Sequence, residues 1–282
     1  MYEELNLDLQ SFAKRVYDSI LYQSTFYKFL NTNYIGTLRQ TGAPVIEVAK
    51  TNTLSVNVRS TKEIQTGLTP SLVGYSHVMV DLTELNMDYS IRVPLMVAGS
   101  DITNAVQDAA DLQDSAIAKK IDTYGYNKLN ANTDITEFEW APVTKDDYIS
   151  LLNSLRATLF NKDVTGDYRL GLGATEYANY VSALTSVLKF ETLAGREGVD
   201  MGIIARAYGI DAFEINDNVL GGTTGYFFNP IAVVGDTFFS AFVQHNSPQG
   251  YPGYYVLEGT QSFGAQVVRP EAIIRLVDEV SA

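Results

Sequence analysis

The sequence contains no cysteine, only two histidines, and far fewer basic than acidic residues. Without cysteine the chain can form no disulfides and use no thiolate chemistry, so packing alone must stabilise the fold. Twenty basic against thirty-three acidic residues give a formal net charge of −13, which repels phosphate backbones. The basic doublets Lys14–Arg15 and Lys119–Lys120 are isolated. This composition predicts no sequence-specific binding of nucleic acid.

Long hydrophobic runs are also absent. The opening residues, MYEELNLDLQ, lack the basic start and apolar run of a signal peptide. The most apolar stretch, residues 226–243, cannot span a bilayer because it is interrupted by Asn229, Pro230, Gly235 and Asp236. We therefore expect a soluble protein with no membrane partner, made in a cytoplasm.

The chain is long enough, at 282 residues and 46% hydrophobic, for one large domain or two closely connected ones. Residues 8–30 have the spacing of an amphipathic helix, and the following residues, 34–45, lack periodicity and predict an extended arm. The helix places these apolar side chains roughly on one face: Phe12, Val16, Ile20 and Tyr27.

A long two-stranded pattern follows the arm. Apolar and polar residues alternate in three short runs, which begin at Leu54, Val78 and Tyr89. Between the first two runs, Gly67, Pro70 and Gly74 predict a mobile tip. A hairpin of this kind would be about 50 Å long at ~3.3 Å per residue. An isolated ribbon is marginal in water and has free edges, so it needs a neighbour to lie on. The alternative is that these strands fold back into an ordinary sheet.

The period then changes from two to that of a helix. Ser100 is a plausible N-cap with Asp101 in the first turn, and helical spacing continues to about Leu129. The face expected to pack on a sheet comprises Ile102, Ala105, Val106, Ala109, Leu112, Ala116, Ile117, Ile121 and Tyr124. On this assignment Asp114 points outward, so Asp114→Asn should have little effect, whereas Ile121→Asp should unfold the protein.

The second half has an ordinary α/β pattern. Thr144 and Asp147 resemble a capping box that opens a helix lined by Ile149, Leu152, Leu155 and Leu159. The segments predicted as strands are FEWAP, YRLGLG, IARAYGIDAFEI, IAVVGD with FFSAFVQ, GYYVLEG and AQVVRPEAIIRLV, and TEYANYVSALTSVL is predicted as a helix.

Candidate catalytic residues are few. His77 and His245 are far apart in sequence and have no partner at metal-ligand spacing, so both are interpreted as surface polar residues. No HExxH, GxSxG or P-loop pattern occurs. The sequence therefore predicts no catalytic residue, no metal site and no cofactor.

Three weaker motifs have simple structural explanations. Gly171 and Gly173 lack the third glycine of a dinucleotide fingerprint, and only Glu191 stands near the position of its acidic residue, so they predict a tight strand-to-helix turn. Glu137 and Glu139 would lie on one face of a strand, where they are interpreted as its solvent-facing side. Asp217 does not complete a calcium loop, because no carboxylate follows at the closing position.

The order of the elements resembles the major capsid proteins of tailed bacteriophages, whose Hong Kong 97-type fold is shared with encapsulin shells. The segment VNVRSTKEI…GLTPSLVGYSHVMVDLTELNMDYSIRV resembles the extended loop of that family, and SDITNAVQDAADLQDSAIAKKIDTYGYNKLN resembles its spine helix. IARAYGIDAFEINDNV with AVVGDTFFSAFVQ resembles strands of the axial domain, and EGTQSFGAQVVRPEAIIRLV the strands that return to the peripheral domain.

The resemblance implies an α+β fold and a structural, non-enzymatic function. The implied parts are an N-terminal arm (1–41), an extended β-hairpin loop (42–98), a peripheral domain with the spine helix (99–140), an axial α/β domain (141–254) and returning strands of the peripheral domain (255–282). Copies would form the hexamers and pentamers of an icosahedral shell around a phage genome. The shell would assemble in the host cytoplasm with a portal and possible scaffolding or decoration proteins.

The loop tip, with Lys62, Gly67, Pro70 and Gly74, is the predicted assembly region. The first 98 residues suit contacts between identical copies, because eight basic and nine acidic side chains leave them nearly neutral. Two alternatives remain: an encapsulin-like compartment that loads enzymes, and a soluble hydrolase that uses unlinked carboxylates.

Some relatives join a loop lysine to an asparagine of a neighbouring subunit through an isopeptide bond. Here the loop offers Lys50 and Lys62, but no asparagine follows Asn246. In place of an asparagine, the returning strands offer only glutamates such as Glu258 and Glu271 and the glutamines Gln261 and Gln266, whose longer side chains would shift the reaction geometry. The sequence therefore predicts a shell that is held together without covalent links.

Overall fold

The computed structural model describes residues 9–31, 33, 45–51, 75–94, 102–184, 205–207, 209–239, 242–246 and 248–278. Several predicted features lie outside these residues. They are the extended arm over residues 34–44, the strand that begins at Leu54, the loop-tip residues Lys62, Gly67, Pro70 and Gly74, and the N-cap Ser100.

The predicted N-terminal helix is present but shorter than expected. Helix α1 spans Leu9–Gln23, and a 3-10 turn, η1, covers Phe26–Phe29. The helix stops because Asp122 binds the chain beyond it: its carboxylate accepts hydrogen bonds from Ser24 Oγ (2.5 Å) and from the Phe26 backbone N–H (2.9 Å). Phe12, Val16, Ile20 and Tyr27 are buried, as the periodicity predicted.

The spine helix α4 spans Ile102–Ala131, about 45 Å at ~1.5 Å per residue. Val106 and Ile121 are buried against the sheet as predicted, but Leu112 is 76% exposed and Ala116 is also exposed. The prediction that Asp114 points outward is wrong, because its side chain is fully buried. The expected face was misplaced around these positions, because α1 packs along a second side of α4 that the sequence does not distinguish, and Asp114 lies between Ser19 of α1 and Tyr89 of β3.

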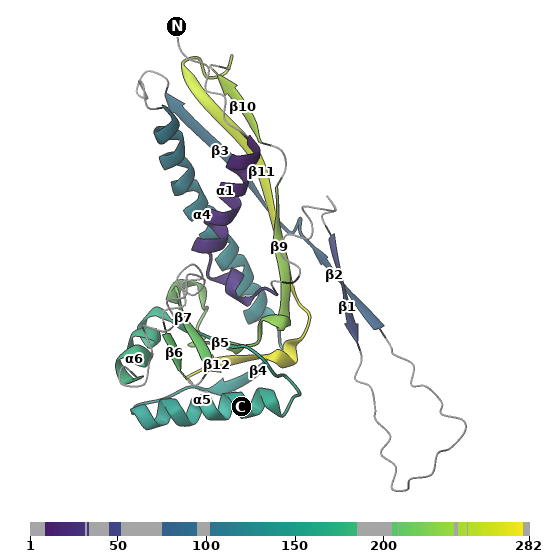
Figure 1. The fold of residues 1–282 in the computed structure, drawn as a ribbon, viewed down its shortest axis with the longest axis vertical. Coiled ribbons are helices and arrows are strands. Elements are labelled where there is room, and N and C mark those ends of the chain that lie inside the picture. The colour runs from purple at the N-terminus through teal and green to yellow at the C-terminus, as the bar shows by residue number, and fades with distance from the viewer. Residues whose placement is uncertain are drawn as a thin grey trace, which may run out of the picture.

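A four-stranded sheet packs against α4. Its order is β10 (Val243–Asn246), β11 (Tyr254–Val267) and β3 (Leu85–Pro94), and β9 (Val233–Phe239) pairs with the other end of β11. All pairs are antiparallel. Figure 1 shows α4 and α1 beside this sheet along most of its length. The sequence assigned β3 to the extended loop, but its ten residues pair with β11 in the body.

A six-stranded mixed sheet forms the other end of the molecule. Its strand order is β4 (Thr136–Glu139), β12 (Ile273–Val277), β8 (Gly225–Phe228), β5 (Tyr168–Gly173), β7 (Ile210–Ile215) and β6 (Ala205–Ala207). Helices α5 (Lys145–Phe160) and α6 (Ala174–Leu184) accompany it, and α5 begins with the predicted capping box of Thr144 and Asp147. Three short 3-10 turns cover Asp217–Val219 (η2), Pro230–Ala232 (η3) and Pro270–Ala272 (η4).

The strand pairing divides the chain differently from the predicted domain boundaries. Strand β12 lies within residues 255–282 but completes the six-stranded sheet, whereas β9 and β10 lie within 141–254 but pair with β11. The predicted division followed chain order, and strand pairing does not: the chain leaves the six-stranded sheet after β8 and returns to it only with β12.

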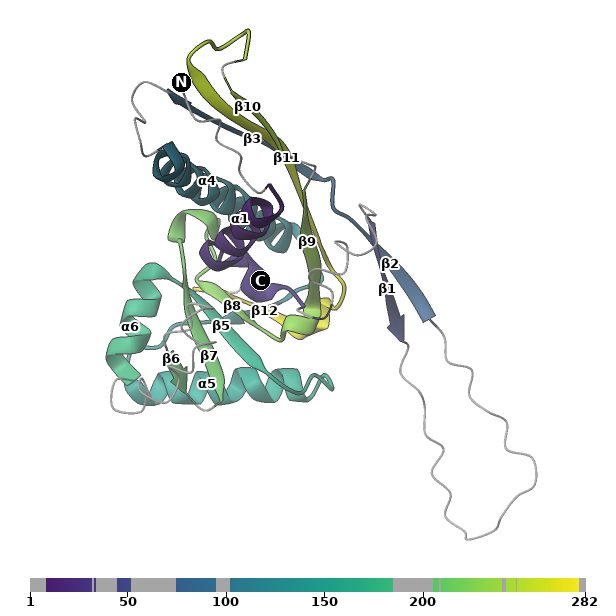
Figure 2. The ribbon, with the colours of Figure 1, turned by 45° about the horizontal axis from the view of Figure 1, so that its top comes forward.

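A two-stranded antiparallel ribbon projects from the body (Figures 1 and 2). We use the word ribbon for β1 (Val45–Thr51) and β2 (Tyr75–Asp81), whose register pairs Val45 with Asp81 and Thr51 with Tyr75. The ribbon has a hydrophobic cluster separate from the main core, formed by Ile46, Val48, Val80, Leu82, Val234 and Val268. The main core runs through both sheets and is rich in aromatic contacts, such as Phe29 stacked 3.8 Å from Phe228.

Candidate assembly surface

The two histidines lie on different sheets. His77 is on β2, where its Nδ1 lies 2.8 Å from Glu47 Oε1 across the ribbon, and both side chains are more than half exposed. His245 is exposed on β10. The structure therefore does not bring the two imidazoles together.

Glu137 and Glu139 have separate surroundings. Glu137 accepts a hydrogen bond from the Arg275 guanidinium (2.9 Å), which also donates to the backbone carbonyls of Leu129, Asn130 and Asn132. This network joins β12 to the end of α4 and to β4. Glu137 is thus a structural ion-pair partner, and the sequence did not predict the role of Arg275.

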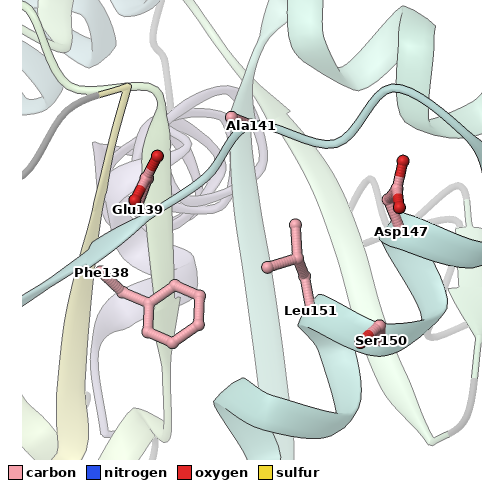
Figure 3. A pocket seen from close by; sticks show the side chains of 6 residues that line it. All are labelled: Phe138, Glu139, Ala141, Asp147, Ser150 and Leu151. Atoms are coloured by element: carbon pink, nitrogen blue, oxygen red, sulfur yellow. The ribbon is translucent and has the colours of Figure 1, made fainter.

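Glu139 lines an open cleft of about 480 Å³ between β4 and α5 (Figure 3). Asp147 stands on the opposite wall, and the cleft is otherwise lined by Phe138, Ala141, Ser150 and Leu151. The Asp147 carboxylate is engaged by the capping box, with 2.7 Å to the Thr144 backbone nitrogen. These hydrogen bonds lower the pKa of Asp147, so it stays ionised and is poorly suited to act as a general acid.

Gly173 stands at the strand-to-helix junction that the sequence predicted, where β5 ends and α6 begins at Ala174, whereas Gly171 lies inside β5 and pairs with Phe213 and Tyr226. A Cβ at Gly171 would lie 2.5 Å from Ile215 Cδ1, and one at Gly173 would overlap the Asp217 carboxylate. Asp217 accepts a hydrogen bond from Thr175 Oγ1 (3.0 Å) at the first turn of α6. A carboxylate of the chain itself therefore occupies the place where a phosphate cradle would bind its anion.

A partly buried carboxylate, Asp122, and a fully buried one, Asp114, hold α1 and η1 on the spine helix. Burial raises the pKa of Asp122, an effect that its hydrogen bonds from Ser24, Thr25 and Phe26 only partly offset. Burial likewise raises the pKa of Asp114 to about 6, against hydrogen bonds from Ser19 and Tyr89. The sequence does not identify these residues, because each partner on α1 or η1 lies more than 90 positions away.

The ribbon offers the clearest surface for contact with another chain. One of its faces buries Ile46, Val48 and Val80, whereas the other leaves Met79 63% and Val45 37% exposed. Among the strands that the structure describes, β1 and β2 pair only with each other, so both outer edges carry unpaired backbone groups. Exposed apolar side chains beside free strand edges are typical of a surface that meets a partner.

Within the described part of the chain, no group of three or more acidic, histidine or cysteine side chains is arranged to hold a metal ion. Among the helices that the structure describes, none is both long and apolar enough to cross a bilayer.

No protein-family model matches the sequence, and no curated protein matches it. Solved structures do match the fold. A chain of Mycobacterium phage Che8 is 18% identical, with 92% of this chain and 93% of that chain covered and a TM-score of 0.58. A chain from the capsid of Ralstonia phage GP4 is 9% identical, with 83% of this chain and 82% of that chain covered and a TM-score of 0.59. A chain from a virus-like particle of Pyrococcus furiosus is 12% identical, with 93% of this chain and 98% of that chain covered and a TM-score of 0.51.

These matches extend over most of both chains, so they concern the whole fold and not one sheet. The chain has the Hong Kong 97-type capsid fold of tailed phages, as its sequence of elements predicted. The helix predicted as the spine is α4, and β1 and β2 lie within the segment predicted as the extended loop.

Proposed function

We propose that this chain is a structural shell protein that assembles with copies of itself into an icosahedral capsid around a phage genome. The observation that carries the proposal is the ribbon, which projects from the body with a separate small core and exposes Met79 and Val45. A lone globular protein gains little from such an element, whereas a subunit that must reach its neighbours requires one.

The proposed organisation follows the parts of the fold. The ribbon and the N-terminal residues would contact neighbouring subunits in hexamers and pentamers, and the end with the six-stranded sheet would lie toward the capsomer centre. The genome would be enclosed without sequence-specific contacts, in keeping with the net charge of −13. A portal, and scaffolding or decoration proteins, would be separate chains, and the product would be a virion.

A second candidate is an encapsulin-like compartment, which would enclose enzymes instead of DNA. The match to the Pyrococcus furiosus virus-like particle favours it, because 98% of that chain is covered. The two candidates share an assembling shell and differ in its contents.

Electron microscopy of the purified full chain tests the proposal. We expect hollow shells or capsomers at high concentration. A stable monomer would contradict assembly and would favour the alternative that the protein is a soluble hydrolase. Particles isolated from the natural source distinguish the two shells: nuclease-protected DNA of defined length supports the capsid, and a co-purifying enzyme without DNA supports the compartment.

A further inference from the structure

The ribbon joins the body at a short turn between β2 and β3. Asp81 ends β2, and its Oδ1 accepts hydrogen bonds from the Thr83 backbone N–H (2.8 Å) and from Thr83 Oγ1 (2.7 Å). Glu84 follows at the end of the turn, immediately before β3 begins at Leu85. The turn therefore has a defined shape where the ribbon leaves the four-stranded sheet.

The backbone of this turn lies directly against β11. A Cβ at Gly264 would overlap the carbonyl oxygen of Asp81 and come within 2.7 Å of Leu82 Cα. Only glycine allows two backbones to approach so closely. Gly264 thus sets the distance between the ribbon and the body but leaves their relative angle to the surrounding side chains.

Three side chains from two elements meet at this point. The Lys128 ammonium, from α4, forms an ion pair with the Glu84 carboxylate, and the Tyr124 hydroxyl donates a hydrogen bond to the same carboxylate. Lys128 also donates to the backbone carbonyl of Ala265 at 2.8 Å and lies 3.4 Å from Gln266 Oε1. One ammonium group therefore connects the turn, the spine helix and β11.

The electrostatics of this cluster are consistent with a firm contact. The Lys128 and Glu84 side chains are 29% and 36% exposed, so solvent only partly screens their attraction. Burial alone would raise the pKa of Glu84, but the hydrogen bonds from Lys128 and Tyr124 outweigh it and lower that pKa. The carboxylate is therefore ionised and bound at neutral pH.

Angle at the turn matters because the ribbon is a lever. Seven residues per strand extend it about 23 Å at ~3.3 Å per residue, so a rotation of about 10° at the turn moves its far end by about 4 Å. Contacts between identical copies close into a shell only when each copy is set at the correct rotation to the next. A displacement of about 4 Å at the far end of the ribbon would change the rotation between neighbouring copies.

We propose that Glu84, Tyr124 and Lys128 are positioning residues that set the angle between the ribbon and the body, and through it the curvature of the shell. The part that concerns curvature rests on the proposed function. The part that concerns the angle does not, because it can be measured on a single chain.

Because the chain has no native cysteine, spin labels can be attached at chosen sites. Met79→Cys on the exposed face of the ribbon and Asn153→Cys on exposed α5 form the labelled pair. Electron–electron double resonance then gives the distance distribution between the two labels in the dissociated full chain. We expect a narrow distribution for the parent, a distribution at least twice as broad or clearly shifted for Lys128→Met, and a narrow one again for Lys128→Arg.

Lys119→Met is the matched control, because Lys119 is an exposed lysine on the same helix and should leave the distribution unchanged. If Lys128→Met does not fold, Glu84→Gln and Tyr124→Phe test the same cluster with smaller changes. An unchanged distribution in the folded variants overturns the proposal.

Particle diameter, measured by cryo-electron microscopy, tests the second part. We expect Lys128→Met particles to differ in mean diameter or to stay open, while Lys119→Met particles match the parent. If Lys128→Met particles are closed and have the same mean diameter as parental particles, the link to curvature is overturned. If the parent forms no particles but Lys128→Met still broadens or shifts the label distribution, the proposed function and the link to curvature are overturned, and the role of the three residues in setting the angle is supported.

Discussion

The body and the ribbon of this protein differ in the size of the apolar cluster that stabilises each of them. The main core joins both sheets with α1 and α4 through an almost continuous set of buried aromatic and aliphatic side chains. The ribbon rests on a cluster of six residues, two of which, Val234 and Val268, belong to the body. Each fully buried Val or Leu stabilises a fold by about 1.5–3 kcal/mol, so the small cluster stabilises the base of the ribbon but contributes little to the stability of the whole chain. Folding and assembly should therefore respond to different substitutions.

The largest effect is expected in the body. Ile121 is fully buried on α4, so Ile121→Asp places an unpaired charge in the main core at a cost of several kcal/mol, comparable with total domain stability. Thermal unfolding followed by circular dichroism should show loss of the cooperative transition. Ala116→Asp, at an exposed position of the same helix, is the control and should melt close to the parent. Equal melting of both variants would contradict the assigned core.

In the extended loop the expected effect is on assembly alone. Replacing residues 63–74 by a short Gly-Ser turn should leave the melting transition of the body unchanged, because the variant keeps every side chain of the described main core. Closed shells should not form, as measured by sedimentation velocity. A variant that still makes normal shells would remove the extended loop from the assembly contacts.

A smaller, pH-dependent effect is expected where α1 meets α4. Buried Asp114 accepts a hydrogen bond from Tyr89 (3.2 Å), and Arg15 and Asp111 are the charged neighbours. Because burial raises its pKa from 3.8 to about 6, the folded state binds the proton more tightly than the unfolded state. Stability should therefore fall as the pH rises from about 4 to about 6, and the loss persists above that range.

Asp114→Asn removes the titrating group and tests this expectation. At pH 8 the variant should be more stable than the parent by about 1–2 kcal/mol, since a shift of this size is worth at most about 3 kcal/mol and burying the asparagine amide offsets part of it. Near pH 4 the difference should disappear. Urea unfolding at both pH values measures the change, and Asp108→Asn, at an exposed site of α4, is the control.

The smallest expected effect is the absence of a covalent product. Gln261 is fully buried and Gln266 is already a neighbour of Lys128, so neither glutamine is presented to a lysine of another copy. Boiled particles should run as one band near 31.1 kDa in denaturing electrophoresis. A ladder that survives boiling and reductant would contradict this, and mass spectrometry would then examine Lys62 first.

Local patterns in the sequence predicted most of the elements. The helical spacing around Val106 and Ile121, the capping box at Thr144 and the turn at Gly173 depend on residues within a few positions of one another, and all three are present. The alternation in β3 was also correct, but its partner was not. Alternation with a period of two indicates which side chains share a face of the strand. It does not indicate which strand lies beside them.

The sequence predicted where the ribbon lies in the chain, but it did not predict the side chains that attach the ribbon to the body. Alternation around Val78 and Val80 correctly indicated a strand of the ribbon. The ion pair between Glu84 and Lys128 joins residues 44 positions apart, and no local signal distinguishes Lys128 from an ordinary exposed lysine. Their proximity depends on how α4 crosses β11, which is a property of the assembled fold.

The sequence by itself determined the type and order of the elements, because periodicity, capping and turn chemistry act between near neighbours. The tertiary structure alone decided which polar groups are buried. Asp114 and Arg275 look like surface residues in sequence, and each becomes buried because another element closes over it, while Asp122 becomes a partly buried anchor of η1. Burial changes the free energy of a charge according to everything packed around it, and that environment is built from residues far apart in the chain.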